Sequence, residues 1–182
     1  RNMGTVKSLL LGMCFVLGAC TSQTSTVQTT EKGTQWEWQN GTIVVKTPER
    51  PAGQKSVLGL TTPKLEAVRV GFVGLGMRGP GAVERFTYIP GTQVVALCDY
   101  EEARADKCQE LLKKASMPKA AVYSGDKGYE ELCKRDDIDL VYIAADWLHH
   151  FPVAKCALEN GKNVAIEVPS AMNLQECWDL IN

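Results

Sequence analysis

The sequence predicts an α/β domain of the doubly wound type, in which helices cover both faces of a parallel sheet. Three observations lead to this prediction. Gly74, Gly76 and Gly79 have the spacing Gly-x-Gly-x-x-Gly directly after the apolar run Val68–Val73, which is typical of a strand that turns into a phosphate-binding helix. The next apolar run ends at Asp99. Five β-prone runs in all alternate with helical patterns, which favours the strand order 3-2-1-4-5.

Each glycine of this turn has its own physical role. The first permits the tight turn, the second lets the backbone approach a pyrophosphate, and the third lets the helix pack closely on the strand. The phosphates then face the N-terminus of the helix. Asp99 lies twenty positions after Gly79, where we expect its carboxylate to accept hydrogen bonds from both adenosine ribose hydroxyls and to repel a 2′-phosphate, so NAD is preferred over NADP. A glycine-rich turn without a ligand is the alternative.

The composition of the chain excludes several classes of function. With 182 residues it is long enough for one domain with a core and an appendage. The net charge is −1 and no basic run is interleaved with aromatic residues, so no nucleic acid partner is expected. Five cysteines follow the N-terminal segment without a Cys-x-x-Cys pair, which predicts free thiols and no metal site. They are Cys98, Cys108, Cys133, Cys156 and Cys177.

Residues 1–19 combine a basic start with the apolar run Leu9–Ala19, which is too short to span a bilayer. This pattern predicts a secretion signal. The sequence Leu17-Gly18-Ala19-Cys20 resembles a bacterial lipobox, in which the cysteine is lipidated. We therefore expect Cys20 to carry a lipid anchor in the membrane of a bacterial cell envelope. An ordinary signal peptide with a small-residue cleavage site is the alternative.

Residues 20–65 are expected to connect this anchor to the domain at 66–182. The stretch Thr21–Gly33 is rich in Ser, Thr and Gln, the composition of a flexible tether without order. Thr47–Lys64 carries three prolines and two glycines and is predicted to be an irregular connector.

A β-hairpin is predicted between the tether and the connector. The β-prone runs Gln35–Gln39 and Thr42–Val45 flank an Asn-Gly pair, the strongest short hairpin signal. Trp36 and Trp38 are two residues apart and share one face of the first run. They could bind a sugar, or they could pack on the partner strand or on a neighbouring domain; the sequence leaves this open.

The domain at 66–182 continues with a helix after Gly79. Pro80 suits its first turn, and Val83, Phe86 and Ile89 recur on the face that would lie on the sheet. A capping box of Asn173 and Glu176 is expected to open the last helix. Between these two helices the predicted elements are strand Thr92–Leu97, helix Glu101–Lys114, strand Ala121–Tyr123, helix Tyr129–Lys134, strand Ile138–Ala145, helix Phe151–Asn160 and strand Asn163–Glu167.

Polar and aromatic residues follow two of these strands. Asp146-Trp147-Leu148-His149-His150 comes after one strand, and Glu167 ends another. Ligands of open α/β sheets lie at this carboxyl edge. Simpler roles are also open, because Asp146 could cap a helix, Trp147 could pack, and Glu167 could cap a turn.

Together with the glycine turn, these motifs resemble the Gfo/Idh/MocA oxidoreductases, and within them the NAD-dependent α-N-acetylgalactosaminidases of glycoside hydrolase family 109. The segments that carry the resemblance are Met77-Arg78-Gly79-Pro80-Gly81, Asp146–His150 and Glu167-Val168-Pro169. The resemblance implies NAD contacts at Met77, Arg78, Asp99, Trp147, Leu148, His149, His150, Glu167 and Val168.

Val168 departs from the wider superfamily, whose dehydrogenases usually carry a lysine at that position to assist proton removal from the substrate hydroxyl. Valine cannot move a proton. The resemblance therefore implies a glycosidase cycle: hydride moves from C3 of the sugar to NAD, the aglycone leaves by elimination, water adds at C1, and the hydride returns. A glycan or glycoconjugate is the implied substrate.

The resemblance also implies that catalytic groups come from a second α/β substrate domain beyond Asn182, so that the chain is expected to be the N-terminal part of an enzyme. Within the chain, His150 is the one catalytic candidate. An NAD-dependent sugar dehydrogenase and a non-enzymatic NAD-binding module are the alternatives, and a homo-oligomer is left open.

Overall fold

The computed structural model of the chain describes residues 26–29, 35–46, 49, 52–54 and 57–182. The predicted signal segment 1–19 and the predicted lipidation site Cys20 lie outside the described residues. Among the residues that it describes, no helix has the length and apolar character needed to cross a membrane.

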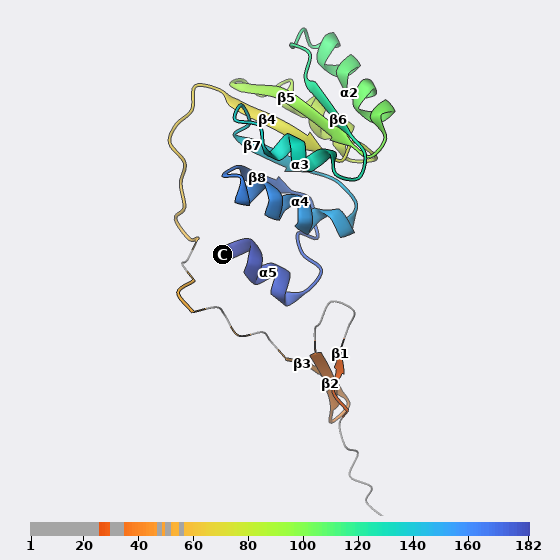
Figure 1. Cartoon of the computed structure of the whole chain (residues 1–182), viewed down its shortest axis with the longest axis vertical. Coiled ribbons are helices and arrows are strands. Elements are labelled where there is room, and N and C mark those ends of the chain that lie inside the picture. Colours follow the sequence, from red (N-terminus) through yellow and green to blue (C-terminus); the bar gives the residue numbers. More distant parts are fainter. Residues whose placement is uncertain (1–25, 30–34, 47–48, 50–51, 55–56) are drawn as a thin grey trace, which may run out of the picture.

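Five parallel strands form the central sheet, with the order β6-β5-β4-β7-β8 (Figure 1). In chain order this is 3-2-1-4-5, so the predicted topology is confirmed. The order reverses at β4, where a crevice opens at the carboxyl edge. The strands are β4 (Val68–Val73), β5 (Thr92–Asp99), β6 (Ala121–Ser124), β7 (Leu140–Ile143) and β8 (Asn163–Ile166).

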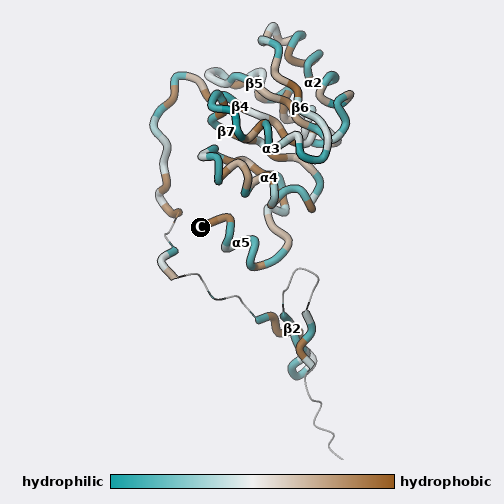
Figure 2. The backbone as a smooth tube through the Cα atoms, in the orientation of Figure 1, coloured by the Kyte–Doolittle hydropathy of each residue, from teal (hydrophilic) through white to brown (hydrophobic). Residues whose placement is uncertain are grey.

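Helices cover both faces of this sheet, as the apolar strands require. α1 and α2 pack on one face, around Phe72, Leu97 and Leu112. α3 and α4 pack on the other face, around Val141 and Ile143, and α5 lies against α4. Figure 2 shows the alternation of hydrophobic and hydrophilic residues along α2 and α4 that this two-sided packing needs. The helices are α1 (Gly79–Phe86), α2 (Glu102–Lys114), α3 (Gly128–Cys133), α4 (Trp147–Glu159) and α5 (Leu174–Ile181).

Three predictions about these elements are wrong. Helix α4 begins at Trp147 rather than Phe151, because the Asp146 side chain accepts a hydrogen bond from the Leu148 N–H and caps the helix four residues earlier. Strand β7 is only four residues long where eight were predicted, since an apolar run does not itself mark where ladder pairing stops. Ile89 lies beyond the end of α1 and is 45% exposed, so it does not join the buried face of that helix.

The predicted hairpin is present as β2 (Gln35–Gln39) and β3 (Thr42–Val45). Asn40 and Gly41 have φ values of 50° and 77°, the two positive values that a two-residue hairpin turn of type I′ needs. Trp36 faces Val45 across the strands, and the Trp36 and Trp38 rings meet edge to face with centroids 6.5 Å apart. This contact lies within β2, and Trp38 is 57% exposed; packing on another element and sugar binding both stay predictions.

One part of the tether is ordered, contrary to prediction. β1 (Gln28–Thr29) pairs antiparallel with β2, so that Gln28 lies opposite Trp36. The exposed edge of a hairpin offers unpaired N–H and C=O groups to any nearby segment, and polar composition does not prevent that pairing.

Candidate cofactor site

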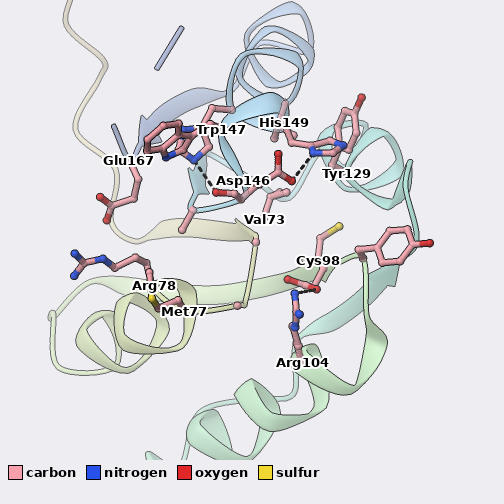
Figure 3. A pocket seen from close by; sticks show the side chains of 18 of the residues that line it. Val73, Met77, Arg78, Cys98, Arg104, Tyr129, Asp146, Trp147, His149 and Glu167 are labelled. Atoms are coloured by element: carbon pink, nitrogen blue, oxygen red, sulfur yellow. Dashed lines mark hydrogen bonds and ion pairs between the residues drawn. The ribbon is translucent and has the colours of Figure 1, made fainter. Parts of the chain in front are cut away.

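A cavity of about 670 Å³ lies at the carboxyl edge of β4, β5 and β7, within the size range of ligand pockets. Ten of the twelve predicted cofactor residues line it, which are Gly74, Gly76, Met77, Arg78, Asp99, Trp147, His149, His150, Glu167 and Val168. Gly79 and Leu148 do not line it. In Figure 3, Glu167, Arg78 and Met77 lie toward one end of the pocket, and Arg104 and Cys98 toward the other.

The glycine turn divides into positions that the fold needs and one that is open to a ligand. Gly74 has a φ of +90°, and a Cβ there would lie 2.3 Å from the backbone nitrogen of Ala145. A Cβ on Gly79 would lie 2.0 Å from the Gly74 carbonyl oxygen. At Gly76 a Cβ would meet only the Arg104 guanidinium, at 3.6 Å. Of the three glycines, only Gly76 is free of backbone atoms on its Cβ side, where a pyrophosphate can approach.

The N-terminus of α1 is suited to an anion. No side chain caps the helix at Arg78, and its first turn contains no acidic residue. Unpaired N–H groups and the helix dipole leave partial positive charge at this end. The Arg78 side chain adds a full positive charge to the same wall of the pocket. This arrangement fits the phosphates of a dinucleotide.

Asp99 closes the opposite end, and most of its hydrogen-bonding capacity is already used. Its side chain is 5% exposed. Oδ2 accepts from the Leu75 N–H at 2.6 Å, while Oδ1 accepts from the Glu101 N–H at 3.0 Å and from Arg104 at 3.2 Å. A carboxylate has about four lone-pair directions, so one further hydrogen bond remains. The prediction of bonds to both ribose hydroxyls therefore exceeds what Asp99 can accept in this arrangement.

Asp146 and His149 form a pair on the α4 side of the pocket. His149 Nδ1 lies 2.6 Å from Asp146 Oδ2, and its Nε2 lies 3.7 Å from Asp126 Oδ1. Burial alone would raise the pKa of Asp146, but hydrogen bonds from His149 and from the Leu148 N–H lower it. Asp146 therefore caps α4, as the simpler alternative proposed, and also orients His149 toward the pocket.

His150 is held by two carbonyl groups. It is 2% exposed, and its Nδ1 and Nε2 lie 2.8 Å from the Pro169 oxygen and 2.9 Å from the Ala145 oxygen. Both ring nitrogens face carbonyl oxygens of the protein, which only accept, so a neutral imidazole donates to one of the two and neither nitrogen is aimed at a substrate. The imidazole joins the ends of β7 and β8, and this geometry does not support the predicted catalytic role.

Glu167 and Val168 form the wall at the other end of the pocket. Glu167 extends β8 by one backbone hydrogen bond, from its N–H to the Ile143 oxygen at 2.9 Å. Its carboxylate Oε1 accepts from the Tyr142 hydroxyl at 2.8 Å. Val168 is 83% exposed and adds an apolar surface next to that carboxylate. Trp147 is exposed at the mouth of the same cavity.

Leu148 is the one predicted contact from its motif that the pocket does not include. Its side chain is exposed and points elsewhere, while its N–H is taken by Asp146. Four residues that the motifs do not predict also line the cavity, namely Arg104, Asp126, Tyr129 and Cys98. Arg104 carried a signal, since it is a basic residue in the first turn of the helix after Asp99. Burial raises the pKa of the Cys98 thiol to about 12, so it is an inert wall group.

Comparison with known proteins identifies the fold and a group of relatives. Residues 68–182 match the family described as "Oxidoreductase family, NAD-binding Rossmann fold", Gfo/Idh/MocA. Glycosyl hydrolase family 109 protein 4 of Phocaeicola vulgatus is 79% identical over 99% of this chain, which spans 35% of that protein. Glycosyl hydrolase family 109 protein 1 of Bacteroides thetaiotaomicron is 56% identical over 97% of the chain and 37% of its own length. The predicted resemblance is confirmed, and the chain spans about a third of the length of these relatives.

Solved structures agree with the Rossmann assignment. Myo-inositol dehydrogenase from Lactobacillus casei, in complex with NAD(H) and myo-inositol, is 26% identical with a TM-score of 0.55, and covers 63% of this chain and 32% of its own. KijD10, a 3-ketoreductase from Actinomadura kijaniata in complex with TDP-benzene and NADP, is 27% identical with a TM-score of 0.53, and covers 63% of this chain and 34% of its own.

Proposed function

Because the chain belongs to the Gfo/Idh/MocA oxidoreductase family, we propose that it forms the NAD-binding part of a glycosidase. The proposed substrate is a glycan or glycoconjugate with a terminal α-linked N-acetylgalactosamine. The proposed reaction is oxidation at C3, in which the hydride goes to NAD and the hydroxyl proton to a base other than residue 168, then loss of the C2 proton with elimination of the aglycone, addition of water across C1 and C2, and return of the hydride and a proton to C3. Relatives that are 79% identical and carry the family 109 name support this proposal over a simple oxidation.

Val168 is the structural observation that carries the proposal. A dehydrogenase that releases an oxidised sugar benefits from a proton-relaying side chain at the nicotinamide end of its site. Here an exposed valine lines the pocket beside Glu167. Its isopropyl group can pack against a ring and exclude water, but it cannot accept a proton.

The residues of the chain bind and orient the cofactor in this proposal. Bound NAD would supply a reversible acceptor for a hydride from the sugar. The open side of Gly76 and the uncapped end of α1 bind the pyrophosphate, and Asp99 binds one adenosine ribose hydroxyl. Glu167 and Val168 hold the nicotinamide end, where the Glu167 carboxylate accepts hydrogen bonds.

Turnover of the full-length protein in heavy water tests the proposed cycle. Elimination removes the C2 proton of the sugar, and addition of water returns one from the solvent. We expect the released N-acetylgalactosamine to carry deuterium at C2, without added oxidant and without accumulation of NADH. Product that lacks deuterium at C2 would contradict the proposal.

A sugar dehydrogenase is the second candidate, and the fold shared with a myo-inositol dehydrogenase favours it. Stoichiometric formation of NADH with an oxidised sugar would establish that activity in place of hydrolysis. Neither activity in a protein that binds NAD would leave a non-enzymatic NAD-binding module.

We further propose that the protein is anchored to a membrane of the bacterial cell envelope through Cys20. The lipobox-like segment and the polar stretch that follows it support this proposal, and two or more acyl chains give a stable anchor. Cys20→Ala should abolish metabolic labelling with palmitate, whereas Cys14→Ala should not. Labelling that persists in Cys20→Ala would show that the anchor is elsewhere or absent.

A further inference from the structure

Tyr142 lies outside the cofactor pocket but touches the carboxylate that lines its nicotinamide end. It is in β7, where it pairs with Phe72 of β4 on one side and Ala165 of β8 on the other. Its hydroxyl lies 2.8 Å from Glu167 Oε1. An ionised carboxylate only accepts hydrogen bonds, so the phenol is the donor.

The Tyr142 ring is fixed by aromatic neighbours on the α1 face of the sheet. Its centroid lies 5.3 Å from that of Phe72 and 5.6 Å from that of Phe86, the latter at an interplanar angle of 75°. Edge-to-face and tilted pairs of this kind are favourable beyond the area that they bury. The strand and the packed ring therefore hold the Tyr142 hydroxyl in a fixed position beside Glu167 Oε1.

The electrostatic environment keeps the Tyr142 phenol protonated and able to donate. Burial raises its pKa, and the hydrogen bond to Glu167 and the negative charge of that residue raise it further. Arg85, on α1, acts in the opposite direction. No other described residue donates a hydrogen bond to the Glu167 carboxylate, so Oε2 is left for a donor in the pocket.

We propose that Tyr142 is a positioning residue, which binds Oε1 of Glu167 and thereby presents Oε2 to a hydrogen-bond donor at the nicotinamide end of the dinucleotide. The donor is a hydroxyl of the nicotinamide ribose or the carboxamide N–H₂. The inference rests on the cofactor site and not on the sugar reaction. A glutamate without this bond rotates among several rotamers and is solvated, so each binding event must order it again.

Binding of two ligands to Tyr142→Phe in the full chain tests the proposal. The substitution removes the hydroxyl and keeps the ring that packs on Phe72 and Phe86. ADP-ribose carries the adenosine and pyrophosphate of NAD without the nicotinamide. We expect calorimetry to show about tenfold weaker binding of NAD, the effect of one charge-assisted hydrogen bond, and binding of ADP-ribose within about twofold of the wild type.

Two further variants separate positioning from general structural support. Glu167→Ala should weaken NAD binding at least as much, and adding Tyr142→Phe to it should cause no further loss, because both act through one contact. Tyr123→Phe is the matched control. Its phenol is also partly buried in the sheet and contacts Arg135 at 3.2 Å, but it does not line the pocket, so neither ligand should be affected.

Several outcomes would overturn the proposal. Equal losses for NAD and ADP-ribose in Tyr142→Phe, or loss of the folded state, would assign the hydroxyl a structural role only. Unchanged NAD affinity, or additive losses in the double variant, would show that Tyr142 does not act through Glu167. Failure of the wild type to bind ADP-ribose would instead reject the cofactor site itself.

Discussion

Asp99 and Glu167 are two carboxylates at the carboxyl edge of one sheet, and the protein uses them differently. Asp99 is almost fully buried and accepts two backbone N–H groups and the Arg104 guanidinium. Glu167 is half-buried and accepts only the Tyr142 hydroxyl among the described residues. Asp99 therefore receives three hydrogen bonds that the fold requires, whereas Glu167 receives one and is available to a ligand.

The glycine turn should show this contrast most strongly. Gly74→Ala places a Cβ 2.3 Å from the backbone of Ala145 at a φ of +90°, and we expect it to lower the free energy of unfolding by about 4 kcal/mol or to prevent folding. Gly76→Ala makes only an ordinary van der Waals contact with the Arg104 guanidinium, so it should unfold like the wild type and lose NAD affinity by more than about tenfold. Urea denaturation and calorimetry measure the two effects; a stable Gly74→Ala variant would contradict this reading of the turn.

The next largest difference is expected between the stability losses caused by replacing Asp99 and Glu167. Asp99→Ala leaves the Leu75 and Glu101 N–H groups and Arg104 without their acceptor. We expect the free energy of unfolding to fall by about 3 kcal/mol. Glu167→Ala removes a half-buried group with one partner and should cost about 1 kcal/mol. Equal losses of unfolding free energy in the two variants would mean that the number of hydrogen-bond donors does not distinguish a structural carboxylate from a ligand-binding one.

The preference for NAD over NADP tests how far Arg104 compensates the charge of Asp99. Arg104 is 3.2 Å from its carboxylate and compensates its charge, so the wild type should prefer NAD over NADP by less than the thousandfold that an unpaired carboxylate would give. Arg104→Ala should raise the ratio of the NADP and NAD dissociation constants by about tenfold. Lys107→Ala removes a charge from the same helix outside the pocket and is the control. A ratio that is unchanged or lower in Arg104→Ala would contradict the prediction.

A third carboxylate, Asp139, should show the smallest effect, through pH. Hydrogen bonds from Arg69 lower its pKa, so its stabilising contribution is present above the ordinary aspartate pKa and is lost as the pH falls through the folded value. Arg69 is partly solvated, and solvent screening keeps the contribution of this ion pair small. Urea denaturation between pH 7 and pH 3 should therefore show a shallower loss of stability in Asp139→Asn than in the wild type. If the free energy of unfolding of the two proteins fell in parallel with pH, this ion pair would not contribute to the loss of stability in acid.

Local patterns were sufficient for the fold. Alternation of apolar runs and helical segments predicts the sheet order, and the Asn40-Gly41 pair predicts the hairpin with its turn, because these signals arise from backbone sterics and from burial on two faces of a sheet. The start of α4 was misplaced by four residues. Pro152 suits a first helical turn and so favours a start at Phe151, whereas the Asp146 side chain caps the helix earlier and Pro152 lies within it.

The sequence, with the family resemblance that its motifs carry, determined ten of the residues that line the pocket, because strand ends and the glycine spacing are local features; Arg104, Asp126, Tyr129 and Cys98 were not among them. Only the tertiary structure decided what those residues are free to do. The Leu75 N–H that binds Asp99 is 24 residues away, the Pro169 carbonyl that binds His150 is 19 away, and Tyr142 is 25 away from Glu167. Hydrogen-bonding capacity is consumed by whichever donors and acceptors the fold brings within about 3 Å, and sequence spacing does not encode that distance.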